Sequence, residues 1–200
     1  EFTVEVQKSA VLVVGESKKK VAAVVRGLEN TPLEIFTDER RIGDEYDLDY
    51  CIVLGGELPR LSRAAPRLLY VQSLNKLSEI PSLPPSSLLL VYPEVIGGDY
   101  IDTPTLDRMV KLAADTKSIK IRGDGLDPYQ LITEEGLIGA ISRALFTPNK
   151  QRKIMVSAAS PASMLSLAYQ VRSSIPFKVD ILFGDDGLAP PVISQAGIGD

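Results

Sequence analysis

Short apolar runs alternate with amphipathic stretches along most of the chain. The apolar runs predict strands at 10–14, 33–37, 50–54, 68–72, 87–92, 118–121, 152–156 and 178–183. Stretches in which apolar residues recur every three or four positions predict helices at 17–29, 57–65, 104–115, 134–146 and 161–173. Several strand runs are apolar throughout, which is typical of strands covered on both faces of a parallel sheet. The pattern therefore predicts an α/β fold with a parallel sheet and flanking helices.

Residues at the expected helix starts support three of these helices. Ser17 is placed as the N-cap of the first helix, because its hydroxyl can accept from a free N–H of the first turn. Thr133 precedes two glutamates, and carboxylates in a first turn are favoured by the helix dipole. Ser160 precedes Pro161, a pair typical of an N-cap followed by the first helical position. We therefore expect helices to begin directly after these cap residues.

Two segments lack a regular pattern. The segment 74–86 contains three prolines, which exclude a long helix and favour a loop. The segment 184–200 is rich in glycine and proline, which is typical of an extended surface segment and suggests a link to further chain.

Composition narrows the class of protein. The chain has 200 residues, of which 44% are hydrophobic and 24% charged, as in soluble globular proteins, and this length allows a full core. Its net charge of −4 gives no reason to expect binding to nucleic acid or to an anionic membrane. No apolar run approaches the length of a membrane span, and the first residues show no secretory leader pattern. We therefore expect a cytoplasmic protein.

The reactive residue types exclude several chemistries. The chain has one cysteine, Cys51, which lies in an apolar run, and it has no histidine. A disulfide framework is thereby excluded, which fits a reducing compartment. Ser-His and Cys-His nucleophiles are excluded as well, and the commonest zinc ligand is missing. We expect no metal site.

The segment from Val11 into the first predicted helix is the most informative. An apolar run ends at Gly15, and a helical pattern then begins. A strand, a glycine turn and a helix in this order are typical of a nucleotide-binding unit, in which further small residues let the backbone approach a pyrophosphate. The corresponding positions hold Lys18 and Val21. The segment predicts that the architecture is kept and that bulky side chains leave no room for a dinucleotide.

Six segments together resemble the extended short-chain dehydrogenase/reductases, the group that contains nucleotide-sugar epimerases and dehydratases. They are 11–28, 36–38, 49–56, 67–73, 91–98 and 121–146. The last, which opens with the sequence IRGDG at 121–125, is the most persuasive. The resemblance implies a Rossmann-like parallel sheet with flanking helices and a small C-terminal α/β lobe. It places the Rossmann-like core in residues 1–100 and the lobe in residues 101–200, packed together as one compact domain.

The resemblance also implies where a nicotinamide cofactor would lie. NAD(P) would be held by Gly15, Ser17, Lys18, Asp38 and Gly55. Asp38 follows the second predicted strand at the spacing of a carboxylate that accepts from ribose hydroxyls.

The catalytic residues of that group are matched only in part. Ser73 stands in the position of its catalytic hydroxyl, at the end of a strand. The group also has an active-site helix with a tyrosine and, four residues later, a lysine, but none of the seven tyrosines here has a lysine at that spacing. The proline-rich segment 74–86 stands where this helix would be. Tyr92 and Tyr100 are the remaining candidates for an acid/base group.

These departures favour a degenerate, non-catalytic domain of the short-chain dehydrogenase type, which serves as a structural, interaction or regulatory module and takes no cofactor. Its expected partner is a protein or the remainder of a longer chain. An alternative is an NAD(P)-dependent nucleotide-sugar epimerase, dehydratase or reductase with a divergent active site, in which Ser73 polarises the substrate. A third hypothesis is a binding module that keeps a mononucleotide or phosphate site at the start of the first helix, near Lys18. The sequence does not indicate an oligomeric state.

Overall fold

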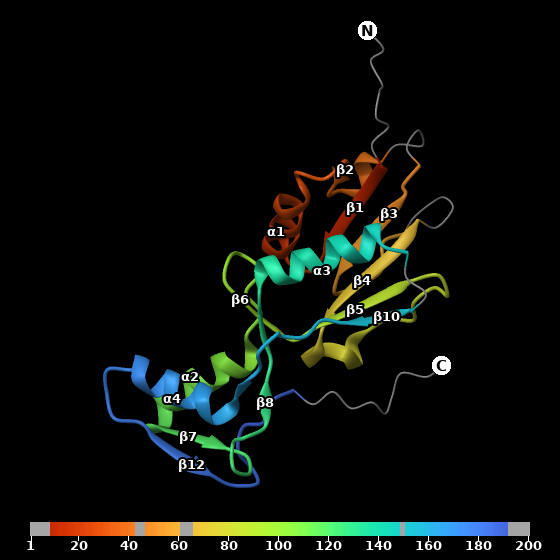
Figure 1. Ribbon diagram of the computed structural model, residues 1–200. Coiled ribbons are helices and arrows are strands. Elements are labelled where there is room, and N and C mark those ends of the chain that lie inside the picture. The colour runs from red at the N-terminus through yellow and green to blue at the C-terminus, as the bar shows by residue number, and fades with distance from the viewer. Residues whose placement is uncertain (1–8, 43–46, 61–65, 149–150, 192–200) are drawn as a thin grey trace.

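The structure, a computed structural model, describes residues 9–42, 47–60, 66–148 and 151–191 (Figure 1). Its strands are β1 Ser9–Gly15, β2 Leu33–Phe36, β3 Tyr50–Leu54, β4 Arg67–Ser73, β5 Leu88–Tyr92, β6 Glu94–Ile96, β7 Ser118–Ile121, β8 Pro128–Tyr129, β9 Leu131–Thr133, β10 Lys153–Met155, β11 Ala162–Ser163 and β12 Asp180–Phe183. Its α-helices are α1 Lys18–Leu28, α2 Pro104–Thr116, α3 Glu134–Phe146 and α4 Met164–Ser174. Two 3-10 helices are η1 Glu39–Arg41 and η2 Leu74–Glu79.

Six strands form one parallel sheet in the order β10-β5-β4-β3-β1-β2. The chain forms β2 on one side of β1 and then crosses to the other side of β1 to form β3. Open α/β sheets bind ligands where the strand order reverses in this way, outside the carboxyl ends of the strands. The sheet confirms the predicted Rossmann-like α/β architecture and indicates where to look for a site.

Helices α1 and α3 cover one face of the sheet (Figure 1). Val24 and Leu28 of α1 are fully buried there, and burying each contributes about 1.5 to 3 kcal/mol. The two helices approach closely at Gly27, where an added Cβ would lie 2.5 Å from Ile138 of α3. A larger residue at this position would push the helices apart.

The opposite face of the sheet is covered differently. Leu12, Cys51 and Tyr70 are fully buried on it. The side chains that pack over them include Leu58, from the segment after β3, and Leu77 of η2. Within the described residues, no α-helix contributes to this second core.

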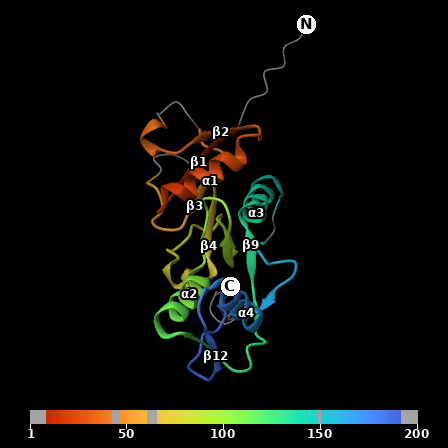
Figure 2. The same ribbon diagram turned by 90° about the vertical axis from the view of Figure 1, so that its left-hand side faces the viewer.

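A smaller lobe lies beyond the carboxyl ends of the sheet strands (Figure 2). Helices α2 and α4 pack there on β7 and β12, around Met109, Ile119 and Met164. The chain enters the lobe through β6, returns through β9 to form α3 and β10, and enters again to form α4 and β12. Three passages of chain therefore join the lobe to the sheet. Among the described helices, none is both long enough and apolar enough to cross a membrane.

Three local predictions need correction. The helix predicted at 57–65 is wrong where it is described: residues 57–60 are not helical, because Pro59 disfavours helical backbone in the residue before it, and 61–65 lie outside the described residues. The last helix begins after Ser163 rather than Ser160, because Ala162 and Ser163 are already paired with β8. The segment 74–86 is not a loop throughout, since it opens with η2.

Candidate functional site

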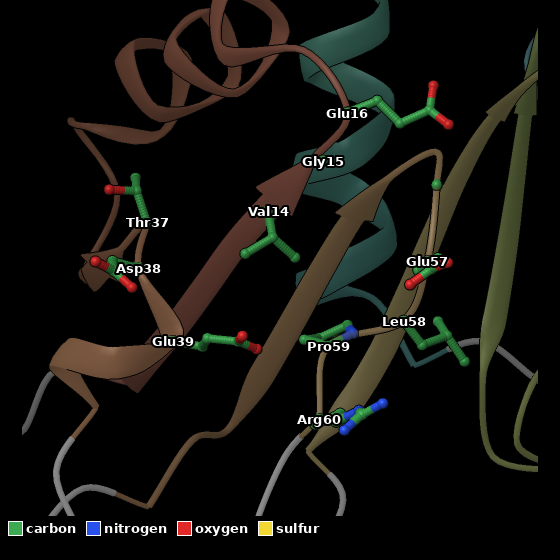
Figure 3. A pocket seen from close by; sticks show the side chains of 11 residues that line it. Val14, Gly15, Glu16, Thr37, Asp38, Glu39, Glu57, Leu58, Pro59 and Arg60 are labelled. Carbon is green, nitrogen blue, oxygen red and sulfur yellow. The ribbon is translucent and has the colours of Figure 1, made fainter.

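The carboxyl ends of β1, β2 and β3 surround a cavity of about 440 Å³ (Figure 3). Val14, Gly15 and Glu16 line it from β1, residues 37–39 from the end of β2, and residues 56–60 from the segment after β3. It is called the switch-point cavity below, because it lies where the strand order reverses. The structure thus brings Gly15 and Asp38, far apart in sequence, to one cavity, and Gly55 directly precedes its lining.

Glycines are required at two of these turns. An added Cβ at Gly15 would lie 2.7 Å from both the Cβ and the carbonyl oxygen of Leu54, so β1 and β3 can approach this closely only with glycine there. Gly55 and Gly56 both have left-handed backbone, with φ of +68° and +79°, which other residues adopt at a cost. The glycines of these turns are thus explained by backbone geometry alone.

The side chain of Glu16 lies over the turn after β3. Its Cγ is 2.7 Å from the position of an added Cβ at Gly56, and its Oε2 is 3.6 Å from Nζ of Lys76. Glu16 therefore places a carboxylate over the turn after β3, at the edge of the cavity.

The lining of the switch-point cavity is acidic. Four carboxylates, from Glu16, Asp38, Glu39 and Glu57, line it together with one guanidinium, from Arg60. Cations outside the lining pair with two of them, Lys76 with Glu16 and Arg40 with Asp38. Figure 3 shows these side chains around the opening. Within the described part of the chain, no three acidic or cysteine side chains are grouped so as to hold a metal ion. Anion binding needs N–H donors or cations, and among the side chains that line the cavity only Arg60 supplies a cation.

Asp38 has a structural role at the end of β2. Its carboxylate accepts hydrogen bonds from the backbone N–H of Arg40 (3.0 Å) and from Nε of the same residue (3.2 Å), and so caps η1. The side chain remains 37% exposed at the rim of the cavity. It is therefore reachable from solvent at the position expected for a ribose-binding carboxylate.

The other predicted cofactor residues lie at the start of α1, directly beside the switch-point cavity. Ser17 is the N-cap, as predicted, and its Oγ accepts from the backbone N–H of Lys20 at 3.4 Å. Lys18 and Val21 line an adjoining hollow of about 570 Å³, which runs along α1 and shares Val14, Gly15 and Thr37 with the switch-point cavity. Ser17 and Lys18 are thus not among the residues that line the switch-point cavity.

Ser73 is almost fully buried, at 1% exposure. Its Oγ accepts from the backbone N–H of Asn75 at 3.4 Å and caps η2. Among the described residues, no base contacts the Ser73 hydroxyl, and a serine without one is a weak nucleophile. The geometry gives Ser73 a structural role.

Tyr92 and Tyr100 lie together at the end of β5, in contact with residues that the sequence patterns did not single out. The Tyr92 hydroxyl donates to Oδ2 of Asp102 at 2.8 Å and receives a hydrogen bond from the Tyr100 hydroxyl at 3.4 Å. Nζ of Lys20, in the first turn of α1, lies 2.8 Å from the same Asp102 oxygen. This group is called the Lys20 cluster below.

Burial governs the ionisation of both tyrosines. It raises the pKa of Tyr92 far above its usual range, and the neighbouring Tyr100 and Asp102 add to the effect. Burial likewise raises the pKa of Tyr100. Both phenols are therefore protonated at neutral pH, and the Tyr92 proton is engaged by a carboxylate.

Glu94 is a buried carboxylate that the sequence patterns did not single out. It has no exposed surface, and its oxygens accept from the backbone N–H groups of Thr105 (2.8 Å) and Leu106 (3.4 Å) at the start of α2. The Tyr129 hydroxyl also donates to it. Glu94 therefore caps a helix of the lobe from a strand that directly follows the sheet. Its only signal in the sequence is a carboxylate just after a buried strand.

Neither protein-family models nor curated protein sequences match the chain. Solved structures share its fold. A GDP-L-fucose synthetase from Naegleria fowleri bound to NADP gives a TM-score of 0.56 at 11% identity, over 94% of this chain and 84% of that one. A dTDP-4-dehydrorhamnose reductase from Yersinia enterocolitica gives 0.55 at 16% identity, over 88% and 84%. The same enzyme from Bacillus anthracis, in complex with NADP, gives 0.55 at 11% identity, over 92% and 89%.

At these identities the likeness establishes the fold. The resemblance to extended short-chain dehydrogenase/reductases, stated from the sequence, is confirmed at this level: the chain has the Rossmann-type fold of sugar-nucleotide reductases.

Proposed function

We propose that this chain keeps the fold of sugar-nucleotide reductases without their dinucleotide chemistry. It serves as a structural, interaction or regulatory module, whose partner is a protein or the remainder of a longer chain. The observation that carries this proposal is the acidic lining of the switch-point cavity, with the Glu16 side chain against Gly56. A carboxylate about 4 Å from a phosphate charge repels it by about 1 kcal/mol even in water. Several such carboxylates would outweigh the attraction of a helix N-terminus.

The candidate catalytic groups support the same proposal. A general base must reach the substrate and have a pKa near the working pH. Tyr92 is buried, its pKa is strongly raised, and its hydroxyl donates a hydrogen bond to Asp102. The Ser73 hydroxyl accepts from the backbone N–H of Asn75 and caps η2. In this arrangement none of these groups is free to move a proton at a substrate.

One observation favours a second function, an NAD(P)-dependent nucleotide-sugar epimerase, dehydratase or reductase. Asp38 lies at the rim of the switch-point cavity with part of its carboxylate exposed. A carboxylate at the end of the second strand is what ribose recognition requires. Two of the solved reductases with this fold hold NADP.

Titration calorimetry with NADPH and NADH distinguishes the two functions. The proposed module gives no saturable heat up to about 1 mM cofactor, which corresponds to binding weaker than about 4 kcal/mol. Stoichiometric binding at micromolar affinity, abolished in Asp38→Ala, would instead establish the second function.

A variant that removes two carboxylates tests whether negative charge is what prevents cofactor binding. In Glu16→Gln/Glu57→Gln the side chains keep their size while two carboxylates leave the cavity, so weak cofactor binding should emerge if charge is what prevents it. Glu135→Gln, on the exposed start of α3, is the matched control and should change nothing.

A further inference from the structure

The Lys20 cluster surrounds one ammonium group with a carboxylate and two aromatic rings. Nζ of Lys20 lies 2.8 Å from Oδ2 of Asp102 and 3.4 Å from the Tyr92 hydroxyl. It also lies 5.0 Å from the ring centre of Tyr100 and 6.0 Å from that of Tyr92. The Asp102 carboxylate is partly buried, with its side chain 18% exposed. A carboxylate together with aromatic faces is the chemistry by which proteins bind ammonium groups.

Tyr92, Tyr100 and Asp102 form the walls of this cluster, and they contact one another as well as Lys20. Tyr92 and Tyr100 are 3% and 1% exposed, and their rings pack edge to face with centres 5.7 Å apart. The Tyr100 hydroxyl donates to Tyr92, and the Tyr92 hydroxyl donates to Asp102. Each tyrosine hydroxyl therefore donates to another residue of the walls, and the Asp102 carboxylate accepts both from Tyr92 and from the Lys20 ammonium.

The walls are also held in place without Lys20. Asp102 pairs with Val95 of β6 through two backbone hydrogen bonds of 2.9 Å. The backbone N–H of Tyr100 donates to Glu134 of α3 at 2.7 Å. Removing the lysine side chain would therefore leave the carboxylate and the rings where they are.

We propose that Tyr92, Tyr100 and Asp102 form a binding site for a primary ammonium group, and that Lys20 fills this site from within the chain. The lysine acts as a tethered ligand that joins α1 of the sheet to the segment entering the lobe. An external alkylammonium ion gains access only when the lysine is removed or loses its charge. This assignment does not involve the switch-point cavity, so it stands or falls separately from the proposed function.

Chemical rescue of Lys20→Ala tests the site directly. The substitution deletes the atoms of a propylammonium group, so added n-propylammonium chloride can replace them. The melting temperature of Lys20→Ala should fall by about 5 °C, and millimolar n-propylammonium should restore much of the loss. Sodium chloride at equal ionic strength and the neutral 1-propanol should not. The second variant, Lys20→Ala/Asp102→Asn, should lose the response.

Lys19→Ala is the matched control. Lys19 is exposed in the same helical turn and has no hydrogen bond or ion pair within the described residues. Its substitution should leave the melting temperature unchanged and give no response to n-propylammonium. Equal stabilisation of Lys20→Ala by propylammonium and by propanol would overturn the proposal.

A measurement on the unaltered chain keeps the proposal testable if Lys20→Ala does not fold. Lysine acylation, followed by mass spectrometry of native protein, should modify Lys20 about tenfold more slowly than Lys19, because the Lys20 ammonium is paired and partly buried. Equal rates at the two lysines would overturn the assignment.

Discussion

At the scale of single residues, Glu94 is the one charged side chain that is fully buried among the described residues. It is a fully buried carboxylate whose oxygens accept from two backbone N–H groups of α2. Nδ2 of Asn75, in η2, lies 3.5 Å from Oε1 of Glu94. A helix N-terminus stabilises a negative charge, and the hydrogen bonds replace lost hydration. Glu94 therefore links the sheet, η2 and the lobe through one side chain.

Substitution of Glu94 should be costly. Glu94→Ala leaves the start of α2 and the Tyr129 hydroxyl without their acceptor, so the free energy of unfolding should fall by about 3 kcal/mol in urea denaturation. Glu135→Ala, an exposed first-turn glutamate of α3, should cost under about 0.5 kcal/mol. Equal stability of the two variants would show that Glu94 does not cap the helix.

Cys51 gives a pH dependence with a definite sign. Burial, and to a lesser extent the Glu39 carboxylate, raises the pKa of its thiol from 9.0 to about 12. The unfolded chain loses this proton at lower pH than the folded chain, so folding stability falls as pH rises through 9.0 toward 12. The thiol contributes a loss of up to about 1.4 kcal/mol per pH unit in this window.

The control for this dependence is Cys51→Ala, which lacks the thiol. Urea unfolding of both chains at two alkaline pH values measures the slopes, and the wild-type free energy of unfolding should fall more steeply. Parallel slopes would contradict the assignment of a buried, protonated thiol.

At the scale of elements, the caps decide where helices begin. Ser17, Thr133 and Ser163 each accept a hydrogen bond from a first-turn N–H of the helix that follows. Two of these were expected from the sequence. The third was not, because Ser160-Pro161 carries an equally good local signal and only the pairing of β11 with β8 decides against it.

A matched pair of serine variants tests this assignment. Ser163→Ala removes a hydroxyl that accepts from the backbone N–H of Ser166 at 3.0 Å, and it should lower the free energy of unfolding by about 1 kcal/mol. Ser160→Ala should have almost no effect. If thermal or urea unfolding gave the reverse order, the helix would begin at Pro161 after all.

The elements that could be predicted are those whose local sequence pattern is compatible with only one kind of secondary structure. Continuously apolar runs such as 50–54 and 68–71 became buried central strands, because a parallel sheet with both faces covered buries every residue of such a run. The helix at 57–65 was predicted from a spacing that also suits a loop with one inward leucine, Leu58. The partners of the tyrosines could not be predicted, since Lys20 and Asp102 are separated by 82 residues.

At the scale of the whole molecule, three passages of chain join the sheet, which has a core on each face, to the lobe, which has a core of its own. The large core lies between the sheet and helices α1 and α3, and the small one lies within the lobe. Hydrogen bonds of Glu94 to Thr105 and Tyr129 cross between them, and the Lys20–Asp102 pair ties α1 to the segment that leads into α2. We propose that the two cores behave as one compact domain, because neither can open without breaking these contacts.

Calorimetric unfolding tests this cooperativity. The heat-capacity trace should show one transition, with the calorimetric enthalpy equal to the van't Hoff enthalpy. Glu94→Ala should shift the whole transition to lower temperature. Two separate transitions in the wild type would show that the cores unfold independently.

We propose that this Rossmann-like fold does not hold a dinucleotide in its switch-point cavity. The most direct test is a crystal structure of the wild-type protein grown with NADPH and a sugar nucleotide at millimolar concentration. We predict no electron density for a pyrophosphate above Gly15, and a Glu16 side chain that still lies over Gly56. An ordered dinucleotide across Gly15, with its ribose on Asp38, would contradict the account.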